Sequence, residues 1–187
     1  IGYVSYVFQG KPIAIPMAYG RMGNKIYLHG SQANRMLTSL IETKEMSVTV
    51  MHLDALVLAR SGFHHSVNYR SATIFGKATN VLDPEEKMAG IKCFMDHMMP
   101  GRWEGVREMN QQEFDRTLVV SMEIETASAK IRDVGVADEP EDINLSVWAG
   151  IMPIKQIAEY PISDKDLPEN VEIPKHVLDY YHKNKVH

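Results

Sequence analysis

The sequence has a single cysteine, Cys93, among 187 residues. One cysteine excludes an internal disulfide framework and any site built from several thiolates, and it is typical of a reducing compartment. No apolar run reaches the roughly 18 residues that a membrane-spanning helix needs, and no signal peptide precedes Ile1. We therefore expect a cytoplasmic protein without a membrane partner.

The sequence also lacks a cluster of basic residues and the short motifs of several large families. Its formal charge is −4, its pI is near 6.1, and its lysines and arginines are scattered, which argues against a nucleic-acid partner. Neither glycine-rich nucleotide loop is present, and HGSQA does not match the G-x-S-x-G motif. Nucleotide-loop folds and nucleophilic hydrolysis are therefore not supported.

What the sequence does contain is a succession of short alternating strands with few helices. Alternation predicts strands over residues 2–8, 12–19, 25–29, 46–52, 56–59, 69–81, 118–127 and 147–154. Capping and apolar spacing predict helices over residues 31–43, 83–100 and 111–116. Without βαβ alternation, this order favours a mainly β (α+β) fold, a small antiparallel barrel with helices packed on it. We assign residues 1–155 to this domain and residues 156–187 to a C-terminal tail that packs on it or on a second copy.

Hydrogen-bonding side chains are concentrated in residues 63–78, FHHSVNYRSATIFGKA. On a strand read from Tyr69, Arg70 opens a face that is otherwise small and apolar. A guanidinium there is costly unless an anion meets it, and its planar fork suits a carboxylate or a phosphate. The partner of Arg70 is therefore either a carboxylate of this chain or a bound anion.

A second polar group, His29-Gly30-Ser31 with Asn34 and Arg35, falls where a predicted strand ends and a helix begins. Free backbone N–H groups and the positive end of the helix dipole meet there, so the group is a candidate phosphate cradle. An ordinary capped helix with a solvated arginine is the alternative. Two arginines near the ends of neighbouring strands favour one shared anion.

Two other features each have a structural and a functional interpretation. His64 and His65 are adjacent, so on an extended segment they point to opposite sides, and no third ligand follows at a suitable spacing. We therefore predict no metal site. Trp148, in a predicted strand, is either a core residue or a cofactor contact.

Five segments in order carry a family resemblance: PIAIPMAYG, KIYLHGSQANRM, LVLARSGFHHSVNYRSATIFGKA, FMDHMMPGRW and VWAGIMPI. Together they resemble the FMN-binding split barrel of the pyridoxamine 5′-phosphate oxidase superfamily, and more narrowly its 5-nitroimidazole-resistance (Nim) branch. The resemblance implies a six-stranded antiparallel split β-barrel and a homodimer with the flavin between protomers. The expected anion is then the flavin phosphate.

The resemblance also implies roles for individual residues. Residues 14–19 correspond to the strand that lines the flavin ring, and Arg35 to a phosphate-binding arginine. Trp148 corresponds to a tryptophan that reaches the flavin across the subunit interface, and His29, at the edge of the ring, is the implied catalytic residue. The implied cofactor-binding residues are Ala14, Ile15, Pro16, Met17, Ala18, Tyr19, Leu28, His29, Gly30, Ser31, Asn34, Arg35, Ser66, Asn68, Tyr69, Arg70, Ser71 and Trp148.

The sequence departs from the oxidases of this superfamily at two places. The phosphate-binding lysine that follows the arginine is Met36 here, which leaves Arg70 or residues 66–68 to compensate. The Arg-x-His segment that grips pyridoxamine phosphate is absent from EYPISDKDLPENVEIP, so vitamin B6 oxidation is not expected.

The leading functional hypothesis is an FMN-dependent reductase. It would take hydride from a nicotinamide or another donor and reduce a small planar acceptor such as a nitroaromatic. FAD is the alternative cofactor, because it presents a phosphate in the same place. The alternative function is a flavin- or haem-binding protein without turnover, because one fold hosts unrelated functions.

Overall fold

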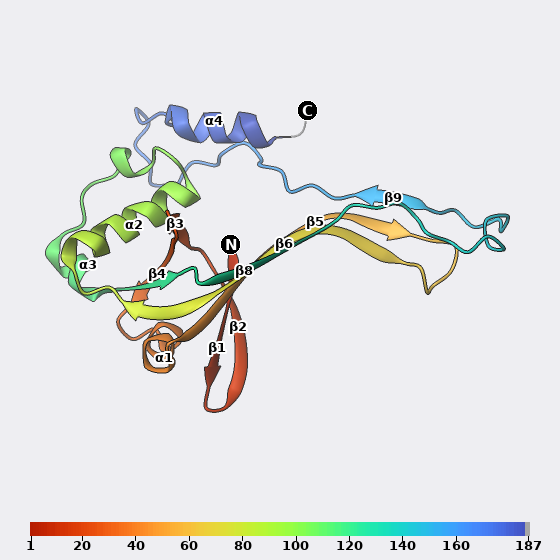
Figure 1. Cartoon of the computed structure of the whole chain (residues 1–187). Helices are drawn as coiled ribbons and strands as arrows, with labels where there is room; N and C mark the ends of the chain where they lie inside the picture. The colour runs from red at the N-terminus through yellow and green to blue at the C-terminus, as the bar shows by residue number, and fades with distance from the viewer. Residues whose placement is uncertain (186–187) are drawn as a thin grey trace.

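Nine strands form a single bent sheet in residues 1–185, the part of the chain that the computed structural model describes (Figure 1). The order is β2-β1-β5-β6-β7-β4-β3, and β8 pairs with β6 while β9 pairs with β5. All these pairings are antiparallel, so the predicted mainly β fold with few helices is confirmed. The strands are β1 (Gly2–Phe8), β2 (Lys11–Met17), β3 (Gly20–Met22), β4 (Lys25–Ser31), β5 (Glu45–Leu58), β6 (Ser66–Asn80), β7 (Thr117–Glu123), β8 (Thr126–Arg132) and β9 (Gly150–Pro153).

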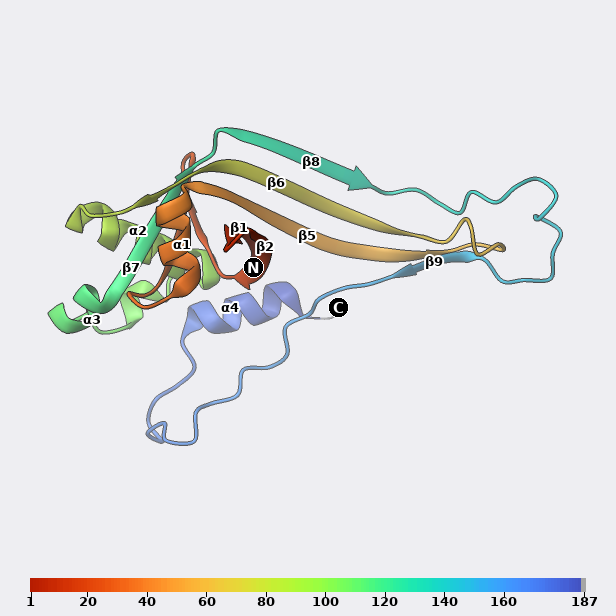
Figure 2. The ribbon, with the colours of Figure 1, turned by 90° about the horizontal axis from the view of Figure 1, so that it is seen from below.

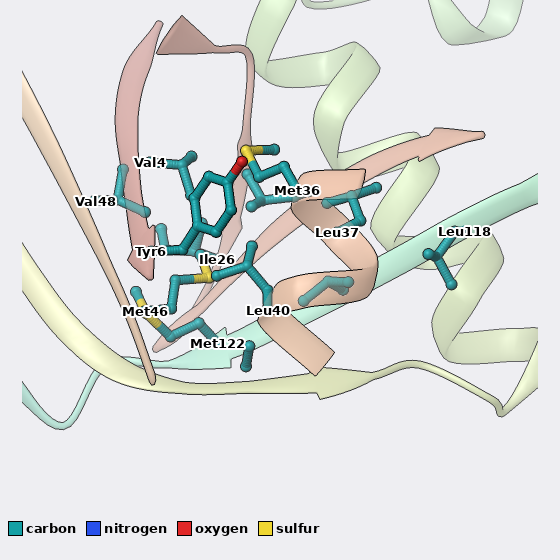
Figure 3. Packing of buried hydrophobic residues seen from close by; sticks show 13 residues of the cluster. Val4, Tyr6, Ile26, Met36, Leu37, Leu40, Met46, Val48, Leu118 and Met122 are labelled. Carbon is teal, nitrogen blue, oxygen red and sulfur yellow. The ribbon is translucent and has the colours of Figure 1, made fainter. Parts of the chain in front are cut away.

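The short strands at one end wrap around the hydrophobic core, and we call this part the barrel. It consists of β1 to β4, β7, the ends of β5 and β6 beside them, and the helices α1 (Arg35–Thr43) and α2 (Pro84–Met98). Helix α1 places Leu37 and Leu40, both 0% exposed, against Val4 and Met122 (Figure 3). Burial of these side chains supplies the main stabilising free energy of the barrel.

The two longest strands run far beyond the barrel (Figures 1 and 2). We call residues 50–72 of the β5–β6 hairpin, together with β8 and β9, the arm. Its strand order is β8-β6-β5-β9, and β5 carries a bulge between Leu53 and Ala55. The predicted strands 46–52 and 56–59 are therefore one strand, because the bulge interrupts the alternation without ending the pairing.

The predicted strand 118–127 is instead two strands. β7 pairs with β4 in the barrel, and β8 pairs with β6 in the arm. Between β7 and β8, the amide of Ile124 donates to the carbonyl oxygen of Asn24 at 2.9 Å. The amide of Glu125 donates to the carbonyl oxygen of Phe75 at 3.0 Å. The chain leaves β4 there and moves from residues 78–80 of β6 to residues 69–75 of the same strand.

Helices α1 and α2 begin at residues whose side chains cap them. The Asp83 carboxylate accepts from the amide of Glu86 at 2.7 Å, and α2 covers β3 and β4. The first helix begins later than predicted, because Ser31 ends β4 and Asn34 is the N-cap of α1. The remaining helices are α3 (Gln111–Arg116), the 3-10 turn η1 (Trp103–Gly105) and α4 (Lys175–Asn184).

Candidate functional site

A cavity of about 460 Å³ lies between β2 and the N-terminus of α1. Its lining comes from three elements and mixes apolar, hydroxyl, amide and guanidinium groups. The lining residues are Tyr6, Ile15, Pro16, Met17, Asn34, Arg35 and Met36. Two segments that the sequence predicts to bind cofactor, the strand 14–19 and the start of the helix, therefore meet here.

The N-terminus of α1 presents hydrogen-bond donors to this cavity. The Asn34 side chain accepts from the amide of Leu37 at 3.1 Å, whereas the amides of Arg35 and Met36 have no partner among the described residues. The exposed Arg35 guanidinium lies 5.0 Å from the ring centroid of Phe8. Free amides, the helix dipole and a guanidinium at one place suit an anion.

Tyr6 supplies a further polar atom that the sequence did not indicate. Its side chain is 4% exposed, and its hydroxyl has no hydrogen-bond partner among the described residues. The hydroxyl is directed towards Met36 at the start of α1 (Figure 3). Because an unpaired buried hydroxyl is unfavourable, this atom fits a polar ligand in the cavity. Alternation along β1 predicts only that Tyr6 faces inward.

Gly30 allows α1 to begin this close to β4. A Cβ on Gly30 would lie 3.0 Å from Leu37 Cδ1 and 3.2 Å from Asn34 Nδ2. The neighbouring Ser31 hydroxyl accepts from the amide of Ala33 at 3.1 Å, which shapes the turn into the helix. Both residues therefore position the N-terminus of α1 beside the cavity.

A second cavity, of about 370 Å³, lies farther along β2. Tyr6 lines both cavities, but the cross-strand partners Ser5, Ala14 and Ser47 place the second cavity on the face of the sheet opposite the first. The other lining residues are Ser5, Val7, Pro12, Ile13, Ala14, Glu45, Met46, Ser47 and Phe75. Of the predicted strand 14–19, Ala14 to Met17 border cavities, whereas the Tyr19 ring packs 4.5 Å from that of His97 on α2.

His29 lies beneath α2. Its ring meets Phe94 edge-on with centroids 4.1 Å apart, and its Nδ1 is buried without a partner among the described residues. Burial lowers the pKa of His29 because the charged imidazolium loses hydration. His29 lines neither of the two cavities along β2, and its neighbour Leu28, 1% exposed, belongs to the core.

Arg70 lies on the arm and has a carboxylate partner in its own chain. Its Nη2 donates to Asp54 at 2.9 Å and its Nε at 3.0 Å, which holds the pKa of Asp54 below its usual range. About 26 Å of extended strand separates Arg70 from Ala78, whose amide bonds to Lys44 at the end of α1. Within one chain Arg70 does not meet Arg35, so a shared anion would need a second copy.

Of the other predicted residues on β6 and near β9, Asn68 has side-chain partners within the chain. Asn68, 2% exposed, donates to the carbonyl of Val134 at 3.0 Å and accepts from Arg132 at 2.8 Å. Ser66, Tyr69 and Ser71 lie on the same strand, β6. Trp148 is 68% exposed just before β9, and a Cβ on Gly150 would lie 2.9 Å from its ring.

No other grouping in residues 1–185 suggests a metal or a membrane site. This part of the chain holds no set of three or more histidine, cysteine, aspartate or glutamate side chains placed for a metal ion. None of its helices is long and apolar enough to cross a membrane.

Antiparallel strands closed around a core, with a helix N-terminus against β2, define a split-barrel protein. Residues 1–131 match the family model described as pyridoxamine 5′-phosphate oxidase, and the chain belongs to this family. The split-barrel fold expected from the sequence is thereby confirmed. No functionally curated protein matches the chain.

Two solved structures resemble nearly the whole chain. The flavocytochrome Anf3 from Azotobacter vinelandii is 32% identical, with a TM-score of 0.88, over 96% of this chain and 83% of that chain. The FAD and haem binding protein from Mycobacterium smegmatis is 31% identical, with a TM-score of 0.89, over 96% and 88%.

The narrower resemblance to the Nim branch is weaker. A structure described as a candidate 5-nitroimidazole antibiotic resistance protein from Bacteroides thetaiotaomicron is 19% identical, with a TM-score of 0.58, over 68% of this chain and 74% of that chain. This likeness shows the fold alone.

Proposed function

We propose that the protein is a flavin-binding redox protein that also binds haem, and that it works as a homodimer. The main support is the likeness over 96% of the chain to a flavocytochrome and to a protein that binds FAD and haem. The binding of flavin and haem follows the alternative from the sequence, a flavin- or haem-binding protein without turnover, and the redox role is added here. The nitroaromatic reductase has less support, because a likeness at 19% identity carries only the fold.

The flavin phosphate is assigned to the start of α1. The free amides of Arg35 and Met36 and the Arg35 guanidinium bind the phosphate, and the Tyr6 hydroxyl donates to a polar atom of the cofactor. When bound, the flavin supplies hydride and single-electron transfer, and the protein supplies binding and orientation.

FAD is preferred to the FMN expected from the sequence. The support is the likeness over 96% of the chain, at 31% identity, to a protein described as binding FAD and haem.

The homodimer is supported by the apolar surface of the arm. Met51, Ile131 and Trp148 are 51%, 72% and 68% exposed, and their side chains have no cover in one chain. Met51 pairs with Ser71 and Ile131 with Arg70, so these two side chains lie on opposite faces of the arm, and a partner on either face would cover one of them. A second copy covers the arm, and Trp148 then reaches the cofactor of the other protomer, while the C-terminal tail with α4 packs on the domain or on that copy.

His29 is not assigned to the reaction, because its ring lies under α2 against Phe94. The acceptor of the electrons is a small molecule that approaches the flavin from solvent. A nitroaromatic remains one test substrate, and bleaching of the flavin by NAD(P)H with recovery on adding the acceptor would support that activity.

The assignment of the phosphate site is tested by measuring flavin affinity in two arginine variants. Arg35→Ala is expected to weaken FAD binding by about tenfold to 100-fold, because a hydrogen bond to a charged group contributes about 1.5–3 kcal/mol. Arg70→Ala is the control, since Arg70 already binds Asp54, and its FAD affinity should equal that of the wild type. Equal losses in both variants, or a loss only in Arg70→Ala, would overturn the assignment.

A further inference from the structure

The turn between β5 and β6, at the far end of the arm, holds the adjacent residues His64 and His65. Nδ1 of His65 lies 2.8 Å from the backbone carbonyl oxygen of Ser61. A carbonyl oxygen accepts hydrogen bonds and cannot donate, so Nδ1 must carry the proton of the neutral ring. The other nitrogen of His65, Nε2, therefore carries the free lone pair.

This hydrogen bond is the one that metal-binding histidines usually make. A ligating imidazole donates its second ring N–H to a carbonyl or a carboxylate, which fixes the tautomer and the ring orientation and increases the basicity of the ligand nitrogen. His65 is exposed, so Nε2 can be reached from solvent or from a second copy. Its outer nitrogen is available for an iron ion.

The adjacent His64 is placed differently. Its Nε2 lies 3.5 Å from a carboxylate oxygen of Glu139, and its side chain is 18% exposed. A carboxylate partner occupies the nitrogen that a metal would need. His64 therefore serves as a matched control, one residue away on the same turn.

None of the other histidines in residues 1–185 has a ring hydrogen bond to a backbone carbonyl. His29 packs under α2, and His97 packs against Tyr19. Nε2 of His176 is buried. Within the part of the chain that the structure describes, His65 alone combines a fixed tautomer with an accessible Nε2.

The surroundings of His65 suit a large apolar cofactor. Phe63, two residues before it, is 89% exposed, and Val67, two residues after it, is 37% exposed. The turn is held in place by Arg60, whose amide and guanidinium donate to the Asp138 carboxylate at 2.9 and 2.8 Å. A rigid turn keeps the ligand nitrogen in a defined position beside apolar side chains.

We propose that Nε2 of His65 is the axial ligand of the haem iron, with Phe63 and Val67 against the porphyrin. The proposal rests on the proposed function, because it assumes that the protein binds haem. It assigns haem to the end of the arm and the flavin phosphate to the barrel, so the two cofactors have separate binding residues in one chain.

The experiment is a titration of the purified flavin-loaded protein with haemin, followed by the Soret absorbance and by electron paramagnetic resonance. The wild type and His64→Ala are expected to bind haemin with the spectrum of histidine-ligated iron. His65→Ala should bind at least tenfold more weakly and lose that spectrum. Added imidazole should restore the spectrum in His65→Gly, because the free base supplies the missing nitrogen. Flavin content should be equal in all variants, which shows that they fold.

Three results would contradict the proposal. His65→Ala could keep the spectrum and affinity of the wild type, or His64→Ala could lose them instead, and either result would remove His65 as the ligand while leaving haem binding in place. Wild-type protein that holds flavin but binds no haemin would overturn the haem part of the proposed function and the ligand assignment with it.

Discussion

The barrel and the arm share the same two strands, β5 and β6. They differ in how far a single chain buries the apolar side chains of these strands. In the barrel, Val48 and Ala78 on these strands are 1% and 0% exposed. In the arm, Met51 and Val67 on the same strands are 51% and 37% exposed. The barrel therefore buries its own apolar side chains, whereas the arm leaves part of its apolar surface for a partner. Stability resides mainly in the barrel, and the exposed apolar side chains of the arm support the proposed dimer.

The junction of the two regions is at Gly76 on β6, and a substitution there should have the largest effect. A Cβ at this position would lie 2.0 Å from the carbonyl oxygen of Glu123 and 2.8 Å from Met122 Cγ. Gly76→Ala must displace backbone where β7 meets β6, so we expect a loss of about 3 kcal/mol in the free energy of unfolding. Urea unfolding measures the loss.

Gly62 in the turn of the arm is the matched control, because a Cβ there would meet no atom within 4 Å. Gly62→Ala should change the free energy of unfolding by about 1 kcal/mol or less. If Gly76→Ala were as stable as Gly62→Ala, the close approach of β6 and β7 would be wrong.

A pair of apolar truncations compares the two regions directly. Leu40→Ala, at a side chain 0% exposed in the barrel, should cost about 3 kcal/mol by removing core contacts. Ile131→Ala, at a side chain 72% exposed in the arm, should change unfolding at low protein concentration by about 0.5 kcal/mol or less.

The difference in urea unfolding midpoint between the wild type and Ile131→Ala should be larger at high protein concentration than at low concentration. The reason is that association stabilises the folded wild-type chain by mass action. Unfolding midpoints measured over a range of concentrations test this. A midpoint of the wild type that does not change with concentration would argue against the arm as an interface.

The barrel also contains a buried phenol whose titration should affect stability at high pH. Burial and a hydrogen bond to Glu86 at 3.0 Å raise the pKa of Tyr27 to about 12. The unfolded value is about 10. Because the folded state binds the proton more tightly, this contribution is complete below about pH 10 and is lost as the pH rises towards about 12.

The change is measured as the free energy of unfolding against pH in the wild type and in Tyr27→Phe. The wild type should lose stability more steeply between about pH 10 and 12. Parallel curves for the two proteins would show that Tyr27 is not held in its protonated form.

Local signals in the sequence predicted much of the fold. The cap at Asp83 and the apolar spacing of Leu37 and Leu40 correctly predicted α2 and the buried face of α1. The division at Ile124 could not be predicted, because no local signal marks the point where the chain leaves β4 and moves from residues 78–80 of β6 to residues 69–75 of the same strand.

The candidate site was predictable only in part for a similar reason. The meeting of Arg35 with Met17 in one cavity was expected from the family resemblance and agrees with the fold. The ion pair of Arg70 with Asp54 depends on a hairpin register, and the unpaired hydroxyl of Tyr6 depends on how α1 closes over β1. Neither can be read from residues near in sequence.

The central claim is that cofactors are bound by a dimer that forms through the arm. Sedimentation velocity of the purified protein, recorded at the flavin and Soret absorbance bands, tests this claim most directly. The account predicts that both bands sediment together at the mass of two chains. A colourless protein, or a monomer that carries its full complement of cofactor, would contradict it.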